Sequence, residues 1–195
     1  FALTALPNGK TRMYVGDGTS SDSPPNRARF YRTDDAAGAA AFTDMTTPQN
    51  IGYCTSQCWY DNVVYSPAGA PDVVYLGGSY SYGQEHHQSN GRAVLQSIDG
   101  GSTFTDMTLD SDGSGWLHPD QHALVTIPDE PLQWIAGDDG GIVRATGDYV
   151  DASSQCDSRG LTAADTAFCK SMLSRIPAET VNLNKGLSTL QFQSF

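Results

Sequence analysis

A unit of about 60 residues recurs along this chain, and no other feature of the sequence restricts the fold as strongly. In two consecutive copies an acidic residue opens an apolar segment, a proline-containing turn follows, and a second apolar segment ends in glycine. The acids are Asp61 and Asp120 and the glycines are Gly77 and Gly137, so corresponding residues lie about 60 positions apart. An earlier copy ends at Gly16. A repeat of this period indicates modules that stack on one another, because one module cannot bury its apolar surface alone.

The second half of each unit consists of two further apolar segments joined by a turn. In the second copy the segment 93–98 leads through an Asp-Gly-Gly turn into the segment 103–108. This pattern predicts two antiparallel strands joined by a tight turn that depends on glycine. Residues 30–46 repeat the pattern with additional alanines in the turn, and 141–148 is a more eroded copy.

Each unit therefore contains about four short strands bounded by glycine, proline and aspartate. Four-stranded units in tandem are typical of the blades of a β-propeller, whose sheets pack face to face around an axis. We expect an all-β fold with about three such blades, one strand of a fourth, and a short helical insertion. A sandwich of twelve strands is the alternative, but it does not explain a repeat that stays in register with the turns.

The expected blade boundaries are 1–50, 51–110 and 111–183, and 184–195 is expected to start the next blade. All of these segments belong to one propeller domain in this interpretation. At least about four blades are needed to close a ring. We therefore expect the remaining blades to come from the same longer chain or from another chain.

The segment 149–183 interrupts the repeat and carries two cysteines, Cys156 and Cys169. Thr162 and Asp165 have the spacing of a helix capping box. Apolar residues follow at helical spacing, and the pattern ends before a proline. These apolar residues are Ala164, Phe168 and Met172, flanked by Leu161 and Ile176. We expect a disulfide-stapled helical insertion that either covers one end of the ring or contacts a partner.

Composition excludes several classes of function. The chain has 195 residues and a formal net charge of −11, so its surface repels the phosphates of nucleic acids and of anionic membranes. No apolar run approaches the ~20 residues that a membrane-spanning helix needs. The four cysteines form two local pairs, and pairing of Cys54 with Cys58 and of Cys156 with Cys169 fits disulfides better than a metal site. We therefore expect a secreted or cell-surface protein without nucleic-acid partners or a membrane span.

Several motifs together resemble a known family. They lie at 57–61, 71–78, 97–104, 118–124, 137–141 and 184–187. In these motifs the chain is similar to the secreted BNR/Asp-box repeat β-propellers, a sialidase-like and glycosyl-hydrolase-like superfamily. The resemblance implies a structural Asp-box turn, in which the aspartate accepts hydrogen bonds from the turn, glycine supplies a positive φ and an aromatic residue packs beneath. The residues of that turn are Ser97, Asp99, Gly101, Thr103 and Phe104.

Asp61 and Asp120 occupy equivalent places at the start of the first strand in adjacent units. In a propeller the first strands line the central channel, so both carboxylates are expected at the mouth of that channel. There they could act as general acid and general base on a glycosidic bond. The alternative is that each aspartate caps its strand by accepting hydrogen bonds from backbone amides.

Aromatic and histidine side chains lie close to these acids in the sequence, and we expect them to contact a sugar ring. They are Trp59, Tyr60, Trp116, His118 and His122. The spacing His118-x-Asp120-x-His122 also offers three ligands on one edge of an extended strand, with 85–87 as a further source. We favour hydrogen bonding and stacking over a metal site. Residues 110–115 resemble the opening of a calcium loop, but its twelfth position is Gln121 instead of Glu, so Ca²⁺ stays an alternative to the absence of any cofactor.

The expected function is that of an extracellular glycan-binding or glycoside-hydrolase-like module with a glycan or a protein as partner. The motif 175–177 reads Arg-Ile-Pro, as in sialidases, but it follows the Asp-box turns when it should precede them, so the sialidase residues are not carried over. No complete catalytic set is present in the motifs. The alternative is therefore a non-catalytic propeller for adhesion or protein interaction, and enzymatic activity stays open.

Overall fold

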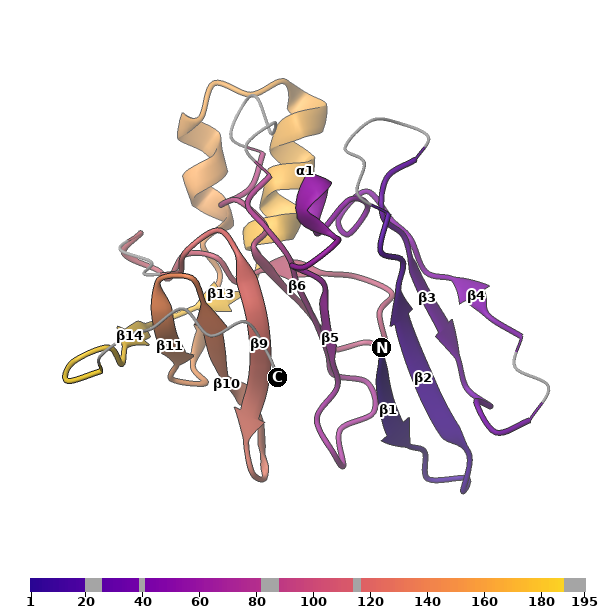
Figure 1. Cartoon of the computed structure of the whole chain (residues 1–195). Coiled ribbons are helices and arrows are strands. Elements are labelled where there is room, and N and C mark those ends of the chain that lie inside the picture. The colour runs from indigo at the N-terminus through magenta and orange to yellow at the C-terminus, as the bar shows by residue number, and fades with distance from the viewer. Residues whose placement is uncertain (20–25, 39–40, 82–87, 114–116, 188–195) are drawn as a thin grey trace.

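A computed structural model of the chain describes residues 1–19, 26–38, 41–81, 88–113 and 117–187. In these residues the chain is mostly β, with three antiparallel sheets of four strands each (Figure 1). The all-β prediction is confirmed at this level. A closed ring of sheets is not seen within the described ranges.

Strand order in each sheet follows the chain. The first sheet comprises β1 (Ala2–Ala5), β2 (Thr11–Gly16), β3 (Phe30–Thr33) and β4 (Thr43–Asp44). The second comprises β5 (Val63–Tyr65), β6 (Val74–Gly77), β7 (Val94–Ser97) and β8 (Thr105–Asp106). The third comprises β9 (Gln121–Ile127), β10 (Glu130–Asp138), β11 (Gly141–Ala145) and β14 (Thr180–Asn182). A separate antiparallel pair joins β12 (Tyr149–Val150) to β13 (Ile176–Pro177).

The pairing register shows that the sequence repeat is also a structural repeat. In each sheet the glycine near the end of the second strand pairs with a residue near the start of the third. The pairs are Gly16 with Phe30, Gly77 with Val94, and Gly137 with Ile142. Because side chains alternate between faces with a period of two, equal register places equivalent side chains on equivalent faces.

The second sheet lies between the other two and is buried on both faces (Figure 1). Every residue of β6 and β7 is buried. One face, which includes Leu76, packs in a cluster with Phe30 of the first sheet. The opposite face, which includes Tyr75, packs in a cluster with Trp134 of the third sheet. The sheets therefore stack face to face, as strands that are apolar on both sides require.

The same hydrogen bond occurs at both junctions between sheets. The hydroxyl of Tyr14 in β2 donates to the carbonyl of Pro71, at 2.7 Å. One repeat later, the hydroxyl of Tyr75 in β6 donates to the carbonyl of Pro131, at 2.9 Å. Each bond joins the second strand of one sheet to the next sheet, at Pro71 before β6 and at Pro131 near the start of β10.

The outward faces of the first and third sheets keep apolar side chains in contact with solvent. Leu3 in β1 is 55% exposed and Val125 in β9 is 51% exposed. A side chain added at Gly77 would come within 3.3 Å of Gln121 in the neighbouring sheet, whereas one at Gly137 would meet only Ala123, at 3.8 Å. The third sheet thus has a glycine at the position that corresponds to Gly77, but no other sheet packs on that face within the described residues.

The insertion replaces the short turn between the third and fourth strands of the third sheet. It contains a 3₁₀ helix (Ser153–Ser158) and α1 (Ala163–Leu173), which the Cys156–Cys169 disulfide joins. The other predicted disulfide, Cys54–Cys58, spans a 3₁₀ helix (Thr55–Gln57). Both predicted disulfides are therefore confirmed. The predicted insertion 149–183 also includes β14, which pairs with β11 and is the fourth strand of the third sheet.

The helix α1 begins at the predicted capping box, where the backbone N–H of Asp165 donates to Oγ1 of Thr162. The predicted stripe is confirmed at Phe168 and Met172, which pack in the core cluster, but not at Ala164. Ala164 is exposed, whereas Cys169 and Met172 are fully buried. The disulfide of Cys169 turns this side of the helix toward the core, a constraint that helical spacing alone does not contain.

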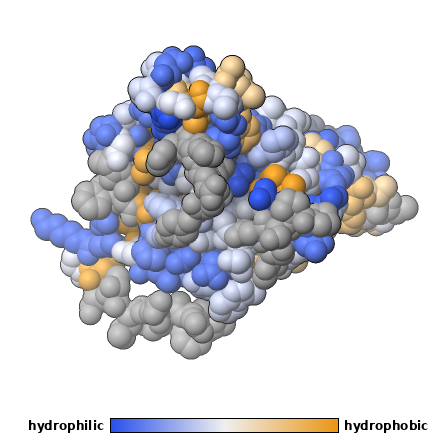
Figure 2. Space-filling model, turned by 90° about the horizontal axis from the view of Figure 1, so that it is seen from above, coloured by the Kyte–Doolittle hydropathy of each residue, from blue (hydrophilic) through white to orange (hydrophobic). Residues whose placement is uncertain are grey.

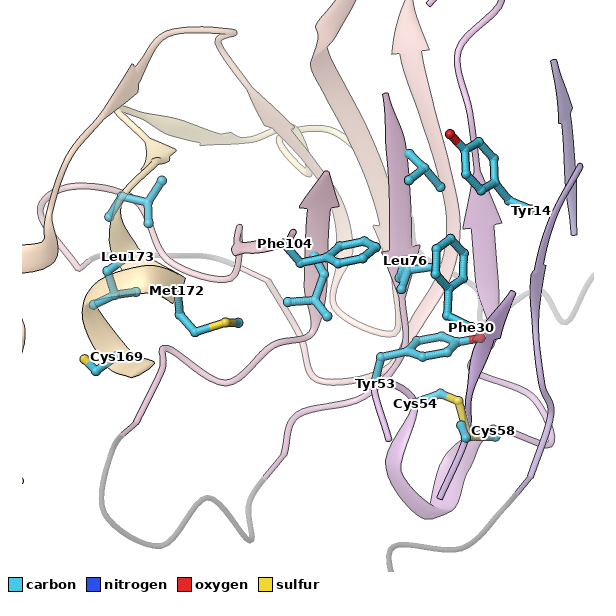
Figure 3. Packing of buried hydrophobic residues seen from close by; sticks show 14 of the residues in the cluster. Tyr14, Phe30, Tyr53, Cys54, Cys58, Leu76, Phe104, Cys169, Met172 and Leu173 are labelled. Atoms are coloured by element: carbon cyan, nitrogen blue, oxygen red, sulfur yellow. A yellow bond between two sulfur atoms is a disulfide. The ribbon is translucent and has the colours of Figure 1, made fainter. Parts of the chain in front are cut away.

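Packing of α1 enlarges the core between the first and second sheets. Figure 3 shows Phe104, just before β8, between Met172 of the helix and Phe30 of the first sheet. The rings of Phe30 and Phe104 meet edge to face at 5.6 Å. The insertion is therefore part of the hydrophobic core and not an appendage on its surface.

Polar residues dominate the end of the molecule that carries α1. Seen from this end, hydrophobic residues form only small separate patches among polar ones (Figure 2). None of the helices in the described ranges combines the length and the apolar character needed to cross a bilayer.

Candidate functional site

Acidic residues that flank the strands of two adjacent sheets come together in the structure. Asp61 lies just before β5 and Asp120 just before β9, and these two strands are in contact. A third acid, Asp139, follows β10, which pairs with β9. We refer to Asp61, Asp120 and Asp139, together with His118 and His122, as the acid–histidine cluster.

Asp61 is completely buried, and its carboxylate oxygens make no hydrogen bond of ordinary geometry, although the side chains of Tyr60 and Asp120 lie close to them. Its ion-pair contact is with Nδ1 of His122, 3.3 Å from Oδ1. Burial, and then the neighbouring carboxylates of Asp120 and Asp139, raise the pKa of Asp61 to about 8. Buried carboxylates in proteins normally have donors that offset the loss of water. Asp61 does not cap a strand in the way the alternative interpretation requires, because no backbone amide donates to it.

His122 lies between two of the acids. Its Nδ1 faces Asp61, and its Nε2 lies 2.5 Å from Oδ1 of Asp139. The imidazole ring is 5.4 Å from the ring of Tyr60, which in turn is 4.4 Å from the ring of Trp59. Trp59 is 70% exposed. An aromatic row therefore leads from the buried carboxylate to the surface.

Tyr60 is held in its neutral form by this environment. Burial, and then the negative charges of Asp61, Asp120 and Asp139, raise the pKa of Tyr60 to about 12. A neutral phenol can both donate and accept a hydrogen bond. Tyr60 can therefore bind hydroxyl groups of a ligand at neutral pH.

Polar contacts fix the loop that carries His118 and Asp120. The backbone N–H of His118 donates to Oδ2 of Asp138 at 2.9 Å, and the hydroxyl of Ser79 donates to Oδ1 of Asp120 at 3.0 Å. Asp138 also accepts from the N–H of Gly140, at 2.9 Å. Asp138 thus holds both sides of the site, since it joins the start of the loop before β9 to the turn after β10.

A compact group of potential ligand atoms results from this arrangement. One such atom from each of His118, Asp120 and Asp139 lies within 4.8 Å of the other two. Each of these residues is partly buried. His122 does not belong to this group, because its two ring nitrogens face Asp61 and Asp139. Of the expected His-x-Asp-x-His ligands, His118 and Asp120 therefore belong to this group, whereas His122 contacts Asp61 and Asp139.

Most of the predicted site residues surround this cluster. Asp61, Asp120, His118 and His122 belong to it, Tyr60 stacks near His122, and Trp59 reaches it through Tyr60. Trp116 and the segment 85–87 lie outside the described residues. Sequence reasoning did not select Asp139 as a site residue. The available signal was the place of Asp139 beside the repeat glycine Gly137, which the pairing of β9 with β10 brings next to Asp120.

The predicted Asp-box turn shows a dense set of hydrogen bonds. Oδ1 of Asp99 accepts from the N–H groups of Ser102 and Thr103, at 3.0 and 2.9 Å, and Oδ2 accepts from the hydroxyl of Thr103 at 2.7 Å. The hydroxyl of Ser97 donates to Oδ1 of Asp99 at 2.7 Å and accepts from the N–H of Gly101 at 2.9 Å. Gly101 has a φ of +88°, and the following Phe104 is buried. These contacts give the turn a structural role.

Asp110, the first residue of the alternative calcium loop, accepts hydrogen bonds from a distant segment of the chain. Its Oδ2 accepts hydrogen bonds from the N–H and the hydroxyl of Thr180, at 3.0 and 2.8 Å. Gln121, at the twelfth position, donates from Nε2 to the carbonyl of His118. Residues 114–116 of the loop lie outside the described ranges. In the part that is described, Asp110 anchors β14 to the second sheet.

Comparison of the chain with models of known protein families, with curated proteins and with solved structures found no match.

Proposed function

We propose that this chain is part of an extracellular β-propeller that binds neutral glycans at the acid–histidine cluster. The observation that carries the proposal is the exposed ring of Trp59, which continues through Tyr60 to a cluster of carboxylates and imidazoles. An aromatic face can stack on the apolar face of a pyranose ring, while carboxylates and imidazoles bind its hydroxyl groups. The negative charge of the cluster favours neutral sugars over acidic ones.

Support for a propeller comes from the way the sheets stack. The first two junctions use equivalent residues, as the Tyr14 and Tyr75 hydrogen bonds illustrate. The third sheet carries Ile135 at the corresponding position, on the face that no further sheet covers in the described residues. Further sheets packed on the outward faces would bury Leu3 and Val125 and extend the series around an axis.

Support for an extracellular location comes from the two disulfides. Disulfides persist in oxidising compartments and are rare in the cytosol. Treatment of the native protein with a thiol reagent, before and after reduction, tests this part of the proposal. We expect no reactive thiol before reduction and four per chain afterwards, since all four cysteines are paired.

Glycan binding is tested by screening the full-length protein on a panel of neutral and acidic glycans, followed by titration calorimetry of the ligands found. We expect Trp59→Ala to weaken binding by at least about 10-fold, because stacking of one ring contributes about 1.5 kcal/mol. Phe42→Ala is the matched control, since Phe42 is an exposed aromatic residue just before β4. It should leave affinity unchanged.

Two results would contradict the proposal. Absence of binding to every glycan on the panel would favour the alternative, a propeller for protein interaction. Equal loss in the Trp59 and Phe42 variants would place the binding surface elsewhere. Release of a sugar from a bound glycan would extend the proposal to hydrolysis by the carboxylates of the cluster.

A further inference from the structure

The acid–histidine cluster concentrates negative charge in a place that water reaches poorly. Asp61 is fully buried and Asp120 has a side chain that is 18% exposed. The ion pairs that the structure shows for these two acids are with His122 and His118, respectively. Buried carboxylates that lie close together repel one another unless a proton or a cation lies between them.

The ligand atoms of His118, Asp120 and Asp139 have the spacing of a metal-binding set. Ligands of one zinc ion lie about 2.0–2.2 Å from the metal, so two of them are separated by at most about 4.4 Å. The three atoms of this set lie within 4.8 Å of one another. A shift of a few tenths of an ångström in the side chains would bring all of them into the range of one ion.

Asp61 supplies a second and independent observation. Both of its carboxylate oxygens are buried without a hydrogen bond of ordinary geometry, and the side chain lies beside Asp120 and Asp139. A carboxylate that is buried beside two other acids without a hydrogen bond of ordinary geometry is expected to be stabilised by a cation. Its position between two sheets shows that a bound ion would also join the second sheet to the third.

Neighbouring groups orient the ligands as outer-shell partners do in metal sites. Nε2 of His122 contacts Asp139, and the hydroxyl of Ser79 donates to Asp120. Asp138 accepts from the backbone of His118 and thereby holds the residue that carries the imidazole ligand. Contacts of this kind fix ring and carboxylate orientation and contribute to metal affinity.

We propose that His118, Asp120 and Asp139 bind one divalent first-row transition-metal ion, with the buried carboxylate of Asp61 beside the site. One imidazole with carboxylates suits Zn²⁺ or Mn²⁺, whereas Ca²⁺ and Mg²⁺ prefer sites made of oxygen ligands only. We commit to Zn²⁺ as the tightest of these ions, in line with the general order of affinities. This inference goes beyond glycan binding and does not depend on it.

The test uses the full-length protein after removal of metals with a chelator. Titration calorimetry with Zn²⁺, Mn²⁺ and Ca²⁺ measures affinity and stoichiometry, and the absorption spectrum of the Co²⁺ form reports ligand type. We expect one Zn²⁺ per chain, weaker Mn²⁺ and the weakest response to Ca²⁺. The variants His118→Gln and Asp139→Asn should each lose at least about 10-fold in Zn²⁺ affinity.

Asp129→Asn is the matched control. Asp129 lies in the turn at the opposite end of the β9–β10 hairpin and has a φ of +63°, which asparagine adopts readily. This variant should bind Zn²⁺ like the parent protein. Asp61→Asn should weaken Zn²⁺ binding and also reduce the rise in melting temperature that Zn²⁺ produces, and circular dichroism shows whether each variant is folded.

Three results would overturn the proposal. One is the absence of Zn²⁺ or Mn²⁺ binding to the folded parent protein. Another is full affinity in both His118→Gln and Asp139→Asn, which would mean that the ion binds at other side chains. The third is a preference for Ca²⁺ over Zn²⁺.

Discussion

Two aspartates of this protein show how differently one residue type can be used. Asp99 lies in a turn where N–H and hydroxyl groups surround its carboxylate. Partial burial raises the pKa of Asp99, but the hydrogen bonds from Thr103, Ser97 and Ser102 outweigh this effect and hold the pKa below its usual value. Asp61 is buried without such donors, and its pKa is raised. The carboxylate of Asp99 is held by hydrogen bonds within its turn, whereas that of Asp61 is buried beside other acids.

We expect Asp99→Asn to destabilise the protein in a pH-dependent way. A carboxyl group whose pKa is lowered on folding stabilises the native state above its unfolded pKa of about 3.9, and this contribution is lost as pH falls through the folded pKa. The difference in urea midpoint between parent and variant should therefore be largest from pH 5 to 7 and shrink below about pH 4. Asp129→Asn controls for removal of one acidic side chain. A difference in urea midpoint that is independent of pH would show that the stability of the turn does not depend on the charge of Asp99.

At the scale of secondary-structure elements, each sheet is tied to the next by side chains of its second strand. Tyr14 and Tyr75 make the same hydrogen bond at the two junctions, to Pro71 and Pro131. Arg12, also in β2, donates to Asp34 of its own sheet and to Asp72 of the next, at 2.6 Å in both cases. These polar contacts fix the position of each sheet relative to the next, which hydrophobic stacking alone leaves undefined.

Tyr14→Phe and Tyr75→Phe test this equivalence. Each removes the hydroxyl that donates to a proline carbonyl, so each should lower the free energy of unfolding by about 1 kcal/mol. Arg12 still donates to the carbonyl of Pro71, at 3.1 Å, in Tyr14→Phe. Chemical denaturation at one pH measures both. A large effect for one tyrosine and none for the other would contradict the equivalence of the two junctions.

The helix α1 offers a second test at this scale. Met172 is fully buried in the cluster with Phe104 and Phe30, and Met172→Ala should cost about 2–5 kcal/mol through lost contacts and a cavity. Ala164, which helical spacing had placed on the same stripe, is exposed. Ala164→Ser should therefore change stability by less than about 0.5 kcal/mol. Similar losses in the two variants would favour the stripe expected from the sequence over the observed one.

For the whole molecule, the central question is whether further sheets cover the two outward faces. Gly77 is enclosed between Val63 and Gln121, at 3.1 and 3.3 Å from the position of an added side chain. Gly137 occupies the corresponding place in the third sheet. There an added side chain would meet only Cβ of Ala123, at an ordinary van der Waals distance of 3.8 Å. A propeller would bring the first strand of a further sheet against Gly137, as β9 lies against Gly77.

The propeller proposal therefore predicts similar losses for Gly77→Ala and Gly137→Ala in the full-length protein. Each should destabilise it by about 1–3 kcal/mol, because an added methyl group overpacks a close contact between sheets. Melting temperatures and denaturant midpoints of both variants measure the effect. If Gly137→Ala is neutral while Gly77→Ala is not, no sheet packs on the third one.

Several features of the fold were predictable because they depend on residues close together in the chain. The strand-turn-strand segments, the capping box and the two disulfides all involve short spacings, and the structure contains them. The four-stranded sheets followed from the repeat. The extent of the insertion was misjudged because β14 is a short strand whose only signal is its pairing with β11, 35 residues or more away in the chain.

The candidate site was predictable in part for the same reason. The repeat placed Asp61 and Asp120 at equivalent positions, which adjacent sheets bring together. The contribution of Asp139 and the division of roles between His118 and His122 depend on the pairing of β9 with β10 and on side-chain orientation.

The amino-acid sequence by itself determined the repeated four-stranded sheets, the turns and the disulfide pairs. These features depend on local propensity and on the alternation of apolar residues, which involve residues close together in the chain. Only the tertiary structure decided which carboxylate is buried beside other acids and which face of α1 meets the core. Burial and charge environment are properties of what packs around a residue, and residues 56 to 70 positions away in the chain contribute to that packing in this protein.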